Sequence, residues 1–297
     1  MIREILEHHD RAPSAAAFMA RALLPSPGQS EDGGFPRIVQ RWTGLRIDPS
    51  HHAAFHRATG LGDEQGISVL YPHVLGFRLQ MALLTHRAFP LPIWRALQIR
   101  NRLVCHRRID LRETLDLETR TGTHRIVEKG IEVDLISRLM RGQDCCWESR
   151  ITYFYRGRFG AGGTEAPEAA SPDLSRAPGV ERFQMPQSGG WRFGGLTGDY
   201  NGIHYWPWYA RRFGFRTAFP HPQRVAGMCM ARLRGPDADL QTLELWIKGP
   251  LFYGANVVLS GATNGRGVQF GLSLDGDRRA ALLGQWQGGA RAGLNAG

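Results

Sequence analysis

The sequence contains no run of about 18 apolar residues, so it offers no candidate for a membrane-spanning helix. The start of the chain, from Met1 to Asp10, carries acidic residues early and has no apolar core, so we expect no secretory signal peptide. Cysteines are few and match no metal-ligand spacing: Cys105, Cys145, Cys146 and Cys229. Reduced thiols and a cytoplasmic location are therefore expected.

Signals for nucleic-acid binding are also missing, although the chain carries a formal net charge of +10. The arginines are scattered, and no basic run is interleaved with aromatic residues. We therefore predict no nucleic-acid partner. The positive charge points to an anionic partner. A phosphate-bearing small molecule or an acidic carrier protein would satisfy it equally well, and a generally basic proteome would also explain it.

Histidines gather at one place without the other ligands that a metal site needs. A helix is predicted between Asp48, a suitable N-cap, and Gly60, a suitable end, and it contains His51, His52 and His56. His52 and His56 share a helical face, but no acidic residue or cysteine completes a site. We predict a polar helix face and no metal.

The rest of the first half predicts one buried helix followed by long strands. Residues 1–30 have helical spacing and predict an N-terminal helical extension. Val74–Leu84 is apolar almost all round, so this helix should be buried. A period of two then predicts antiparallel strands at Leu103–Ile109, Thr114–Thr119, Arg125–Ile136 and Cys145–Tyr155, with turns at 121–123 and 141–144. Residues 31–156 are thus predicted to be α+β, a sheet wrapped around a helix.

The second half repeats this order. Residues 157–179 are rich in glycine, alanine, proline and serine and predict a linker. In residues 180–292, Phe219-Pro220-His221 echoes Tyr71-Pro72-His73, and a short hydrophobic helix follows at Val225–Leu233. Further strands are predicted at Gln241–Ile247, Ala255–Gly261, Val268–Leu274 and Ala280–Trp286. The shared order indicates two tandem copies of one fold.

One short stretch carries groups suited to acid–base chemistry. It runs Gly198-Asp199-Tyr200-Asn201-Gly202-Ile203-His204, and its glycines predict a sharp bend. Such a bend can bring the carboxylate of Asp199 and the imidazole of His204 to one water molecule, whose protons they could move. On spacing alone, a surface turn in which Asp199 caps a helix explains the stretch as well.

This stretch, followed by Tyr209-Ala210 and Gly214-Phe215 and by a helix that starts after His221, resembles the motif of MaoC-like and R-specific enoyl-CoA hydratases. The motif spans about Gly198 to Leu233, and the duplicated architecture extends the resemblance from about Trp42 to Trp286. The resemblance implies a double hot-dog fold.

The same resemblance implies a lyase that reversibly hydrates trans-2-enoyl-CoA to (R)-3-hydroxyacyl-CoA without a metal or redox cofactor. Asp199 and His204 would be the acid–base pair, and Asn201 and Gly198 would support the loop. A monomer and a homodimer both stay open.

The motif departs from the family at the start of the second helix. Pro222 stands where the family has a glycine whose N–H binds the thioester oxygen, and proline has no N–H. We expect the donor to move to the backbone amide of Gln223 or Arg224, and we place His221 with them as a residue that contacts the substrate. Arg224 is either a substrate-facing cation or a solvated side chain.

Two further features leave alternatives open. The run 205–209 is strongly aromatic and forms either core or lid packing, or a wall for the substrate. In the first half, Ser50 falls where His204 would be, so that copy is expected to be degenerate, which by resemblance leaves room for a long acyl chain. The rival functions are a 3-hydroxyacyl-[acyl-carrier-protein] dehydratase and, because of Pro222, a non-catalytic acyl-CoA-binding protein.

Overall fold

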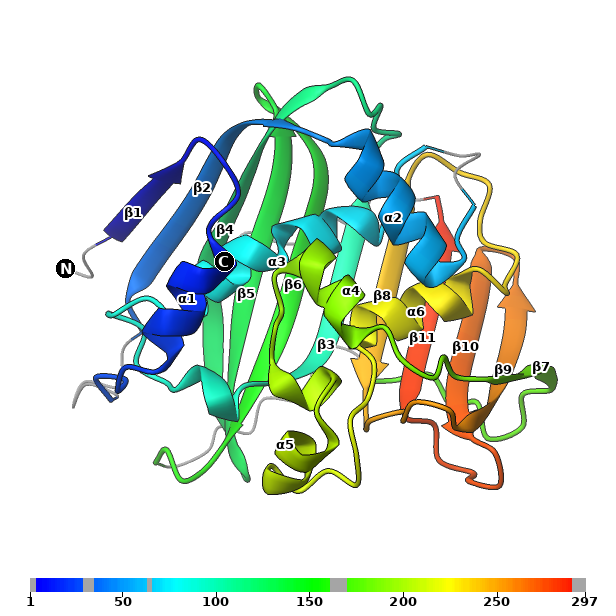
Figure 1. Ribbon diagram of the computed structural model, residues 1–297. Coiled ribbons are helices and arrows are strands. Elements are labelled where there is room, and N and C mark those ends of the chain that lie inside the picture. The colour runs from blue at the N-terminus through cyan, green and yellow to red at the C-terminus, as the bar shows by residue number, and fades with distance from the viewer. Residues whose placement is uncertain (1–3, 29–34, 63–65, 161–169, 290–297) are drawn as a thin grey trace.

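The computed structural model describes residues 4–28, 35–62, 66–160 and 170–289 of the 297-residue chain. In this part of the chain, eleven strands form one sheet in the order β1-β2-β4-β5-β6-β3-β8-β11-β10-β9-β7, and helices lie over one face of it (Figure 1). The strands of the first half are β1 (Glu4–His9), β2 (Arg37–Arg46), β3 (Leu97–Cys105), β4 (Thr114–Val127), β5 (Gly130–Arg141) and β6 (Asp144–Arg156). Those of the second half are β7 (Gly179–Gln184), β8 (Gln241–Ile247), β9 (Asn256–Asn264), β10 (Gly267–Leu274) and β11 (Leu282–Gly288).

The strand order repeats on the two sides of the sheet. Read towards the centre, the first half runs β2-β4-β5-β6-β3 and the second runs β7-β9-β10-β11-β8, and the halves meet where β3 pairs antiparallel with β8. In each half the central helix lies in the chain between the first and second of these strands, α3 (Tyr71–Leu84) in one and α6 (Pro222–Met230) in the other. The two helix-and-sheet units predicted from the sequence are therefore present, joined in one continuous sheet.

The smaller helices follow local signals in the sequence. They are α1 (Ala15–Ala22), α2 (Pro49–Thr59), α4 (Gly190–Thr197) and α5 (Pro207–Arg212), with short 3-10 turns η1 (Ile93–Arg95) and η2 (Gly202–His204). The predicted caps of α2 are observed: Asp48 Oδ1 accepts from the N–H of Ser50 at 2.8 Å, and Gly60 ends the helix with a left-handed φ of +79°. Among the described residues, no helix has both the length and the apolar character needed to cross a membrane.

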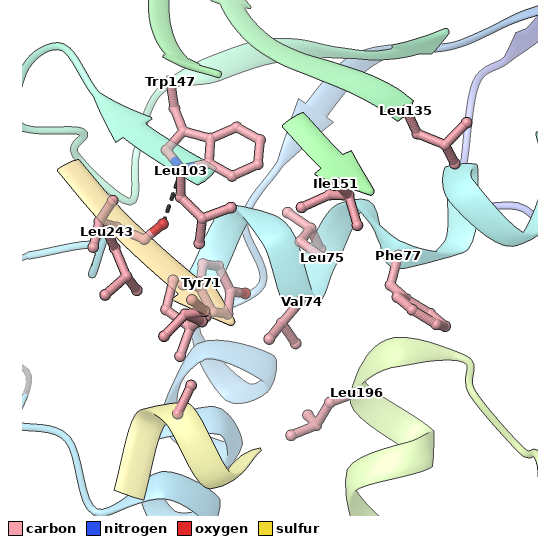
Figure 2. Packing of buried hydrophobic residues seen from close by; sticks show 14 of the residues in the cluster. Tyr71, Val74, Leu75, Phe77, Leu103, Leu135, Trp147, Ile151, Leu196 and Leu243 are labelled. Carbon is pink, nitrogen blue, oxygen red and sulfur yellow. Dashed lines mark hydrogen bonds between the residues drawn. The ribbon is translucent and has the colours of Figure 1, made fainter. Parts of the chain in front are cut away.

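The core lies between α3 and the inner face of the sheet (Figure 2). Leu103 of β3 and Trp147 of β6 are fully buried there, close to Tyr71 at the start of α3. The indole N–H of Trp147 donates to the carbonyl oxygen of Val69 at 2.8 Å, so the one polar group of this large side chain is satisfied. The predicted burial of the helix 74–84 is confirmed, since nearly every residue of α3 is buried.

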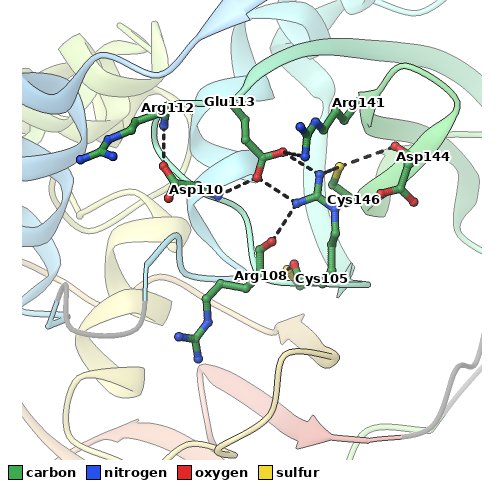
Figure 3. A network of polar contacts seen from close by, with 9 residues as sticks. Cys105, Arg108, Asp110, Arg112, Glu113, Arg141, Asp144 and Cys146 are labelled. Carbon is green, nitrogen blue, oxygen red and sulfur yellow. Dashed lines mark hydrogen bonds and ion pairs between the residues drawn. The ribbon is translucent and has the colours of Figure 1, made fainter.

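A polar network holds the loop that follows β3 (Figure 3). Arg107 donates two hydrogen bonds to the carboxylate of Glu113, at 2.7 and 2.9 Å, and a third to Asp144 at the start of β6, at 3.0 Å. The hydrogen bond from Arg107 lowers the pKa of Glu113 to about 2, so this pair stays ionised at neutral pH. The loop is thereby tied to the adjacent hairpin.

Some predicted elements differ from the structure. Glu4–His9 is not helical but forms β1, which pairs parallel with β2, and only Ala15–Ala22 of the predicted helical extension is a helix. Strand pairing overrides local helical spacing here because His9 and Glu7 hydrogen-bond to the buried Gln40 on β2, at 2.7 and 2.8 Å. Residues 1–3 and 29–30 of that predicted extension lie outside the described residues.

Three other predictions need comment. The turn predicted at 121–123 is a bulge within β4, because pairing with β5 continues on both sides of it. The histidine face of α2 is not solvated: His52 and His56 are only 4% and 9% exposed, because α2 packs against α4 and α6. Of the predicted linker, residues 161–169 lie outside the described residues, as do residues 290–292 of the second predicted unit, and the described linker parts before Gly179 form no helix or strand.

We predict that Leu103→Ala lowers the free energy of unfolding by about 2–5 kcal/mol, because it leaves a cavity in the core beside Trp147. Leu97→Ala on the same strand is the matched control, since Leu97 is 48% exposed and its truncation should cost far less. Urea denaturation of both variants and the wild type measures the difference. Equal losses for the two leucines would contradict this account of the core.

Candidate active site

The loop after α4 is shaped by its own polar side chains. α4 ends at Gly198, whose φ of +82° is strained for other residues. Asp199 Oδ1 then accepts from the N–H of Asn201 at 3.1 Å, and Asn201 Oδ1 accepts from the N–H of Ile203 at 3.3 Å. These side-chain-to-backbone turns lead directly into η2, which ends at His204. The bend predicted from the sequence is present.

The bend brings Asp199 and His204 together. Asp199 Oδ2 lies 3.5 Å from Nε2 of His204. Nδ1 of His204 lies 3.0 Å from the carbonyl oxygen of Phe219, and a carbonyl can only accept, so Nδ1 carries a proton. Nε2 is the ring nitrogen that faces the carboxylate: in the imidazolium form it can donate to Asp199, and in the neutral form it is free to accept a proton. The backbone of His204 is held as well, because the hydroxyl of Tyr253 donates to its carbonyl oxygen at 3.0 Å.

His221 supports this pair from within the core. Its ring stacks on that of His204, with centroids 3.8 Å apart, and its Nε2–H donates to the backbone carbonyl of Asp199 at 3.0 Å. The side chain is fully buried and lines neither of the cavities at the site. The prediction that His221 contacts the substrate is therefore corrected. Its side chain instead holds the backbone of Asp199 in place.

The charges of these groups at neutral pH follow from their surroundings. Burial raises the pKa of Asp199, but the hydrogen bond and the positive charge that His204 offers when its Nε2 is protonated outweigh it and bring that pKa down to about 2. Burial lowers the pKa of His221 to about 3, and repulsion from His204 acts in the same direction. The site therefore holds an ionised Asp199 beside a neutral His221.

Asp199 and His204 open onto a mainly apolar cavity of about 390 Å³. Asn201 and Gln223 line it next to them. Its apolar wall comes from both halves of the chain and includes Phe18, Phe77, Met81, Phe215, Val225 and Leu251. A chain of apolar carbon atoms would therefore be shielded from water beside the acid–base pair.

His204 also lines a second cavity, of about 1100 Å³, with a different character. Arg57, Arg192 and Arg224 line this cavity, and no acidic side chain among the described residues does. Arg224 is half-buried, and its guanidinium donates to the carbonyl oxygens of Ala58 and Ser188 at 3.1 and 2.9 Å. Arg224 is thus anchored by these backbone contacts and also lines the cavity. It is therefore not a freely solvated side chain, and its cation faces a space that a ligand could occupy. The cavity is suited to an anionic group.

The aromatic run 205–209 lies mostly at the surface, and only Tyr205 and Pro207 within it border a cavity, the second one. Trp206 and Trp208 stack on each other and are 47% and 62% exposed. Neither they nor Tyr209 lines either cavity, whereas Tyr205 borders the second one. Of the two alternatives left open for this run, a substrate wall does not fit the two tryptophans, because both lie exposed at the start of α5.

The first half contributes residues to the site that the sequence did not reveal. Tyr153 of β6 and Gln98 of β3 line the first cavity, and the Tyr153 hydroxyl donates to the buried Gln80 of α3 at 3.1 Å. Gln98 and Gln80 in turn lie near the buried His73, the counterpart of His221. No spacing signal connects these residues to the motif, since they come from another part of the chain.

Two groups of side chains have ligand atoms close enough to hold a metal. These are Asp199, His204 and His221, and separately His106, Cys145 and Glu148, with atoms within 4.8 Å of one another in each group. In the first group, Nδ1 of His204 and Nε2 of His221 point at backbone carbonyls. This leaves Asp199 and Nε2 of His204 facing each other, an arrangement that suits a water molecule with two protons to share.

No protein-family model matches the chain. Solved structures define its class: a MaoC-like dehydratase from Phytophthora capsici superposes with a TM-score of 0.69 at 18% identity, over 87% of this chain and 97% of the other. A Mycobacterium tuberculosis protein with a double hot-dog fold superposes with a TM-score of 0.54 at 14% identity, over 88% of this chain and 97% of the other. At these identities the likeness concerns the fold.

Two comparisons with higher identity point to a particular relative. A curated Mycobacterium tuberculosis protein named 3-hydroxyacyl-thioester dehydratase X is 29% identical over 197 residues, which cover 65% of this chain and 70% of that protein. The crystal structure of HtdX from the same organism superposes with a TM-score of 0.70 at 25% identity, over 84% of this chain and 99% of the other. The predicted resemblance to MaoC-like dehydratases, the α+β double hot-dog class and the lyase class are confirmed.

We predict that acidification destabilises the protein through its buried histidines. His221 has an ordinary pKa of 6.5 and a folded pKa of about 3, so between these values the unfolded chain binds a proton that the folded chain does not. Stability is therefore lost as the pH falls from about 6.5 towards 3, by about 1.4 kcal/mol per pH unit for this group.

His221→Gln removes the titrating ring and keeps a donor near Asp199, so its loss of stability between pH 7 and 5 should be smaller than that of the wild type. Guanidinium denaturation at both pH values gives the comparison. Parallel pH dependence in the two proteins would rule out His221 as a source of the acid sensitivity.

Proposed function

We propose that the protein is a dehydratase of 3-hydroxyacyl thioesters that catalyses the reversible hydration of trans-2-enoyl-CoA to (R)-3-hydroxyacyl-CoA. The observation that carries this proposal is the pair formed by Asp199 Oδ2 and His204 Nε2, 3.5 Å apart, between an apolar cavity and an arginine-lined one. A thioester has the matching parts: an apolar acyl chain, a reactive centre and a phosphate-bearing carrier.

The acid–base chemistry follows from the protonation of the pair. A water molecule donates one hydrogen bond to the ionised Asp199 and the other to the unprotonated Nε2 of His204. As the water oxygen bonds to C3 of the enoyl thioester, Nε2 takes a proton from it, and Asp199 stabilises the imidazolium that forms. The imidazolium then returns the proton to C2. Dehydration is the reverse: Nε2 removes the C2 proton and delivers it to the departing 3-hydroxyl group.

Negative charge that develops on the thioester oxygen needs hydrogen-bond donors. The first-turn N–H groups of a helix have no partner within the helix, and α6 starts at the cavity without a side-chain cap. Pro222 supplies no N–H, so the backbone amides of Gln223 and Arg224 are proposed to bind this oxygen, aided by the positive end of the helix.

The carrier part of the substrate is proposed to be coenzyme A, with its phosphates near Arg57, Arg192 and Arg224. An acyl-carrier-protein thioester has a phosphate too, so the carrier-protein dehydratase remains the second candidate. A cytoplasmic location, the lack of a nucleic-acid partner, and a monomeric or dimeric state stay predictions.

We expect Asp199→Asn and His204→Gln each to lower kcat by about 10²- to 10⁴-fold, because each removes one member of the acid–base pair. Loss of the conjugated absorbance of crotonyl-CoA and longer enoyl-CoAs measures the rate. Near wild-type rates in both variants would refute these roles. Binding without turnover by the wild type at every chain length would instead favour the non-catalytic acyl-CoA-binding protein.

Charge attraction predicts that kcat/KM for enoyl-CoA falls as salt is added, because ions screen the arginines of the second cavity from the phosphates of the substrate. The matched control is the enoyl thioester of N-acetylcysteamine, which has the same reacting atoms and no phosphate. Its kcat/KM should change little with salt. An equal response of both substrates would remove the arginines from carrier binding.

A further inference from the structure

Gln223 is a buried polar residue whose side chain is left unpaired. It is only 2% exposed, and it lines the apolar cavity together with Asp199, Asn201 and His204. Within the described part of the chain its Oε1 is buried without a hydrogen-bond partner. A half-turn of the carboxamide exchanges Oε1 and Nε2, so the unpaired position can equally hold the N–H donors. Buried amides are normally satisfied, because an unmade hydrogen bond costs about 1–3 kcal/mol. An unpaired amide in a cavity wall therefore indicates a group that a ligand completes.

Gln223 lies at the start of α6, where the substrate oxygen is proposed to bind. Gln223 is the second residue of α6, a nine-residue helix whose first turn has no side-chain cap, and Pro222 before it lines the same cavity. Pro222 withdraws one of the N–H donors that a helix start normally presents to an anion. The side chain of Gln223 carries two N–H donors to the same wall.

We propose that the Gln223 carboxamide is a catalytic residue that donates a hydrogen bond to the thioester oxygen and so compensates for the donor missing at Pro222. This rests on the proposed function and adds a side-chain donor to the backbone donors at the start of α6. When water adds to C3, the electron pair of the C2–C3 double bond moves onto the thioester oxygen, and Gln223 stabilises that charge until His204 returns the proton to C2. The hydrogen bond is strongest when the negative charge on the thioester oxygen is greatest, which is in the transition state. Loss of the donor should therefore lower kcat.

The test uses Gln223→Met, which keeps the length of the side chain and removes its donors. Loss of one preorganised donor should lower kcat by about 10²- to 10³-fold, with KM for the enoyl-CoA substrate changed by less than tenfold. Pro222→Ala restores a backbone N–H on the same wall at a position that already carries a Cβ. In the double variant with Gln223→Met, this substitution should recover at least tenfold of the lost kcat.

A second measurement reports on the thioester oxygen without turnover. Hexanoyl-CoA with a ¹³C-labelled carbonyl has no double bond and no 3-hydroxyl group, so it binds without reacting. Its carbonyl stretching frequency in the infrared should fall on binding to the wild type, and fall less on binding to Gln223→Met. Unchanged thermal unfolding of Gln223→Met confirms that the comparison is made between folded proteins.

The outcomes separate the two proposals. A wild-type kcat in Gln223→Met, or an equal carbonyl shift in both proteins, would overturn the role of Gln223 and leave the proposed function intact. A rise in KM with kcat unchanged would also overturn it, because that pattern marks a contact equal in ground and transition states. If the wild type turned over no enoyl thioester, the proposed function would fail. A carbonyl shift that depends on Gln223 would then still establish the contact.

Discussion

The antiparallel pairing of β3 with β8 is the contact on which the site depends. It joins two units that each have their own central helix into one sheet, and its ladder runs from Arg100↔Trp246 to Cys105↔Gln241. The cavity beside Asp199 takes one wall from α1, α3, β3 and β6 and the other from the second half. A chain without this junction would carry the motif but would lack the first-half wall of the cavity beside it. The first half therefore contributes a mainly apolar wall of this cavity, which includes Tyr153.

Burial of a carboxylate is the second physical constraint. An ionised Asp199 inside an apolar cavity would be costly without partners, and the surrounding residues supply them. Oδ1 accepts from the Asn201 N–H, Oδ2 faces His204, and the backbone carbonyl accepts from His221. The same contacts that make the charge tolerable also fix its direction. The geometry of the Asp199–His204 pair and the stability of the loop thus depend on the same contacts, and His221 supports both without lining either cavity.

The sequence predicted most of the architecture because its signals were local. A period of two marks the strands of both halves, and β8 follows its predicted bounds, since exposed and buried side chains alternate along a sheet with one face in the core. The caps of α2 and the bend around Gly198 were also local, and both are observed. The errors fall where a distant segment decides: β1 needs β2 as its partner, and the bulge at 121–123 needs the continued pairing with β5. The linker and unit boundaries stay predictions.

The candidate site divides in the same way. The sequence by itself allowed Asp199 and His204 to meet, because only four residues, with Gly202 and Asn201 among them, lie between the two, and it determined that Pro222 offers no N–H. Tertiary structure alone decided that His221 faces the core, that Tyr153 and Gln98 join the cavity, and that Gln223 is buried without a partner. The physical reason is that side-chain direction and burial depend on which elements pack together, and these elements come from both halves of the chain.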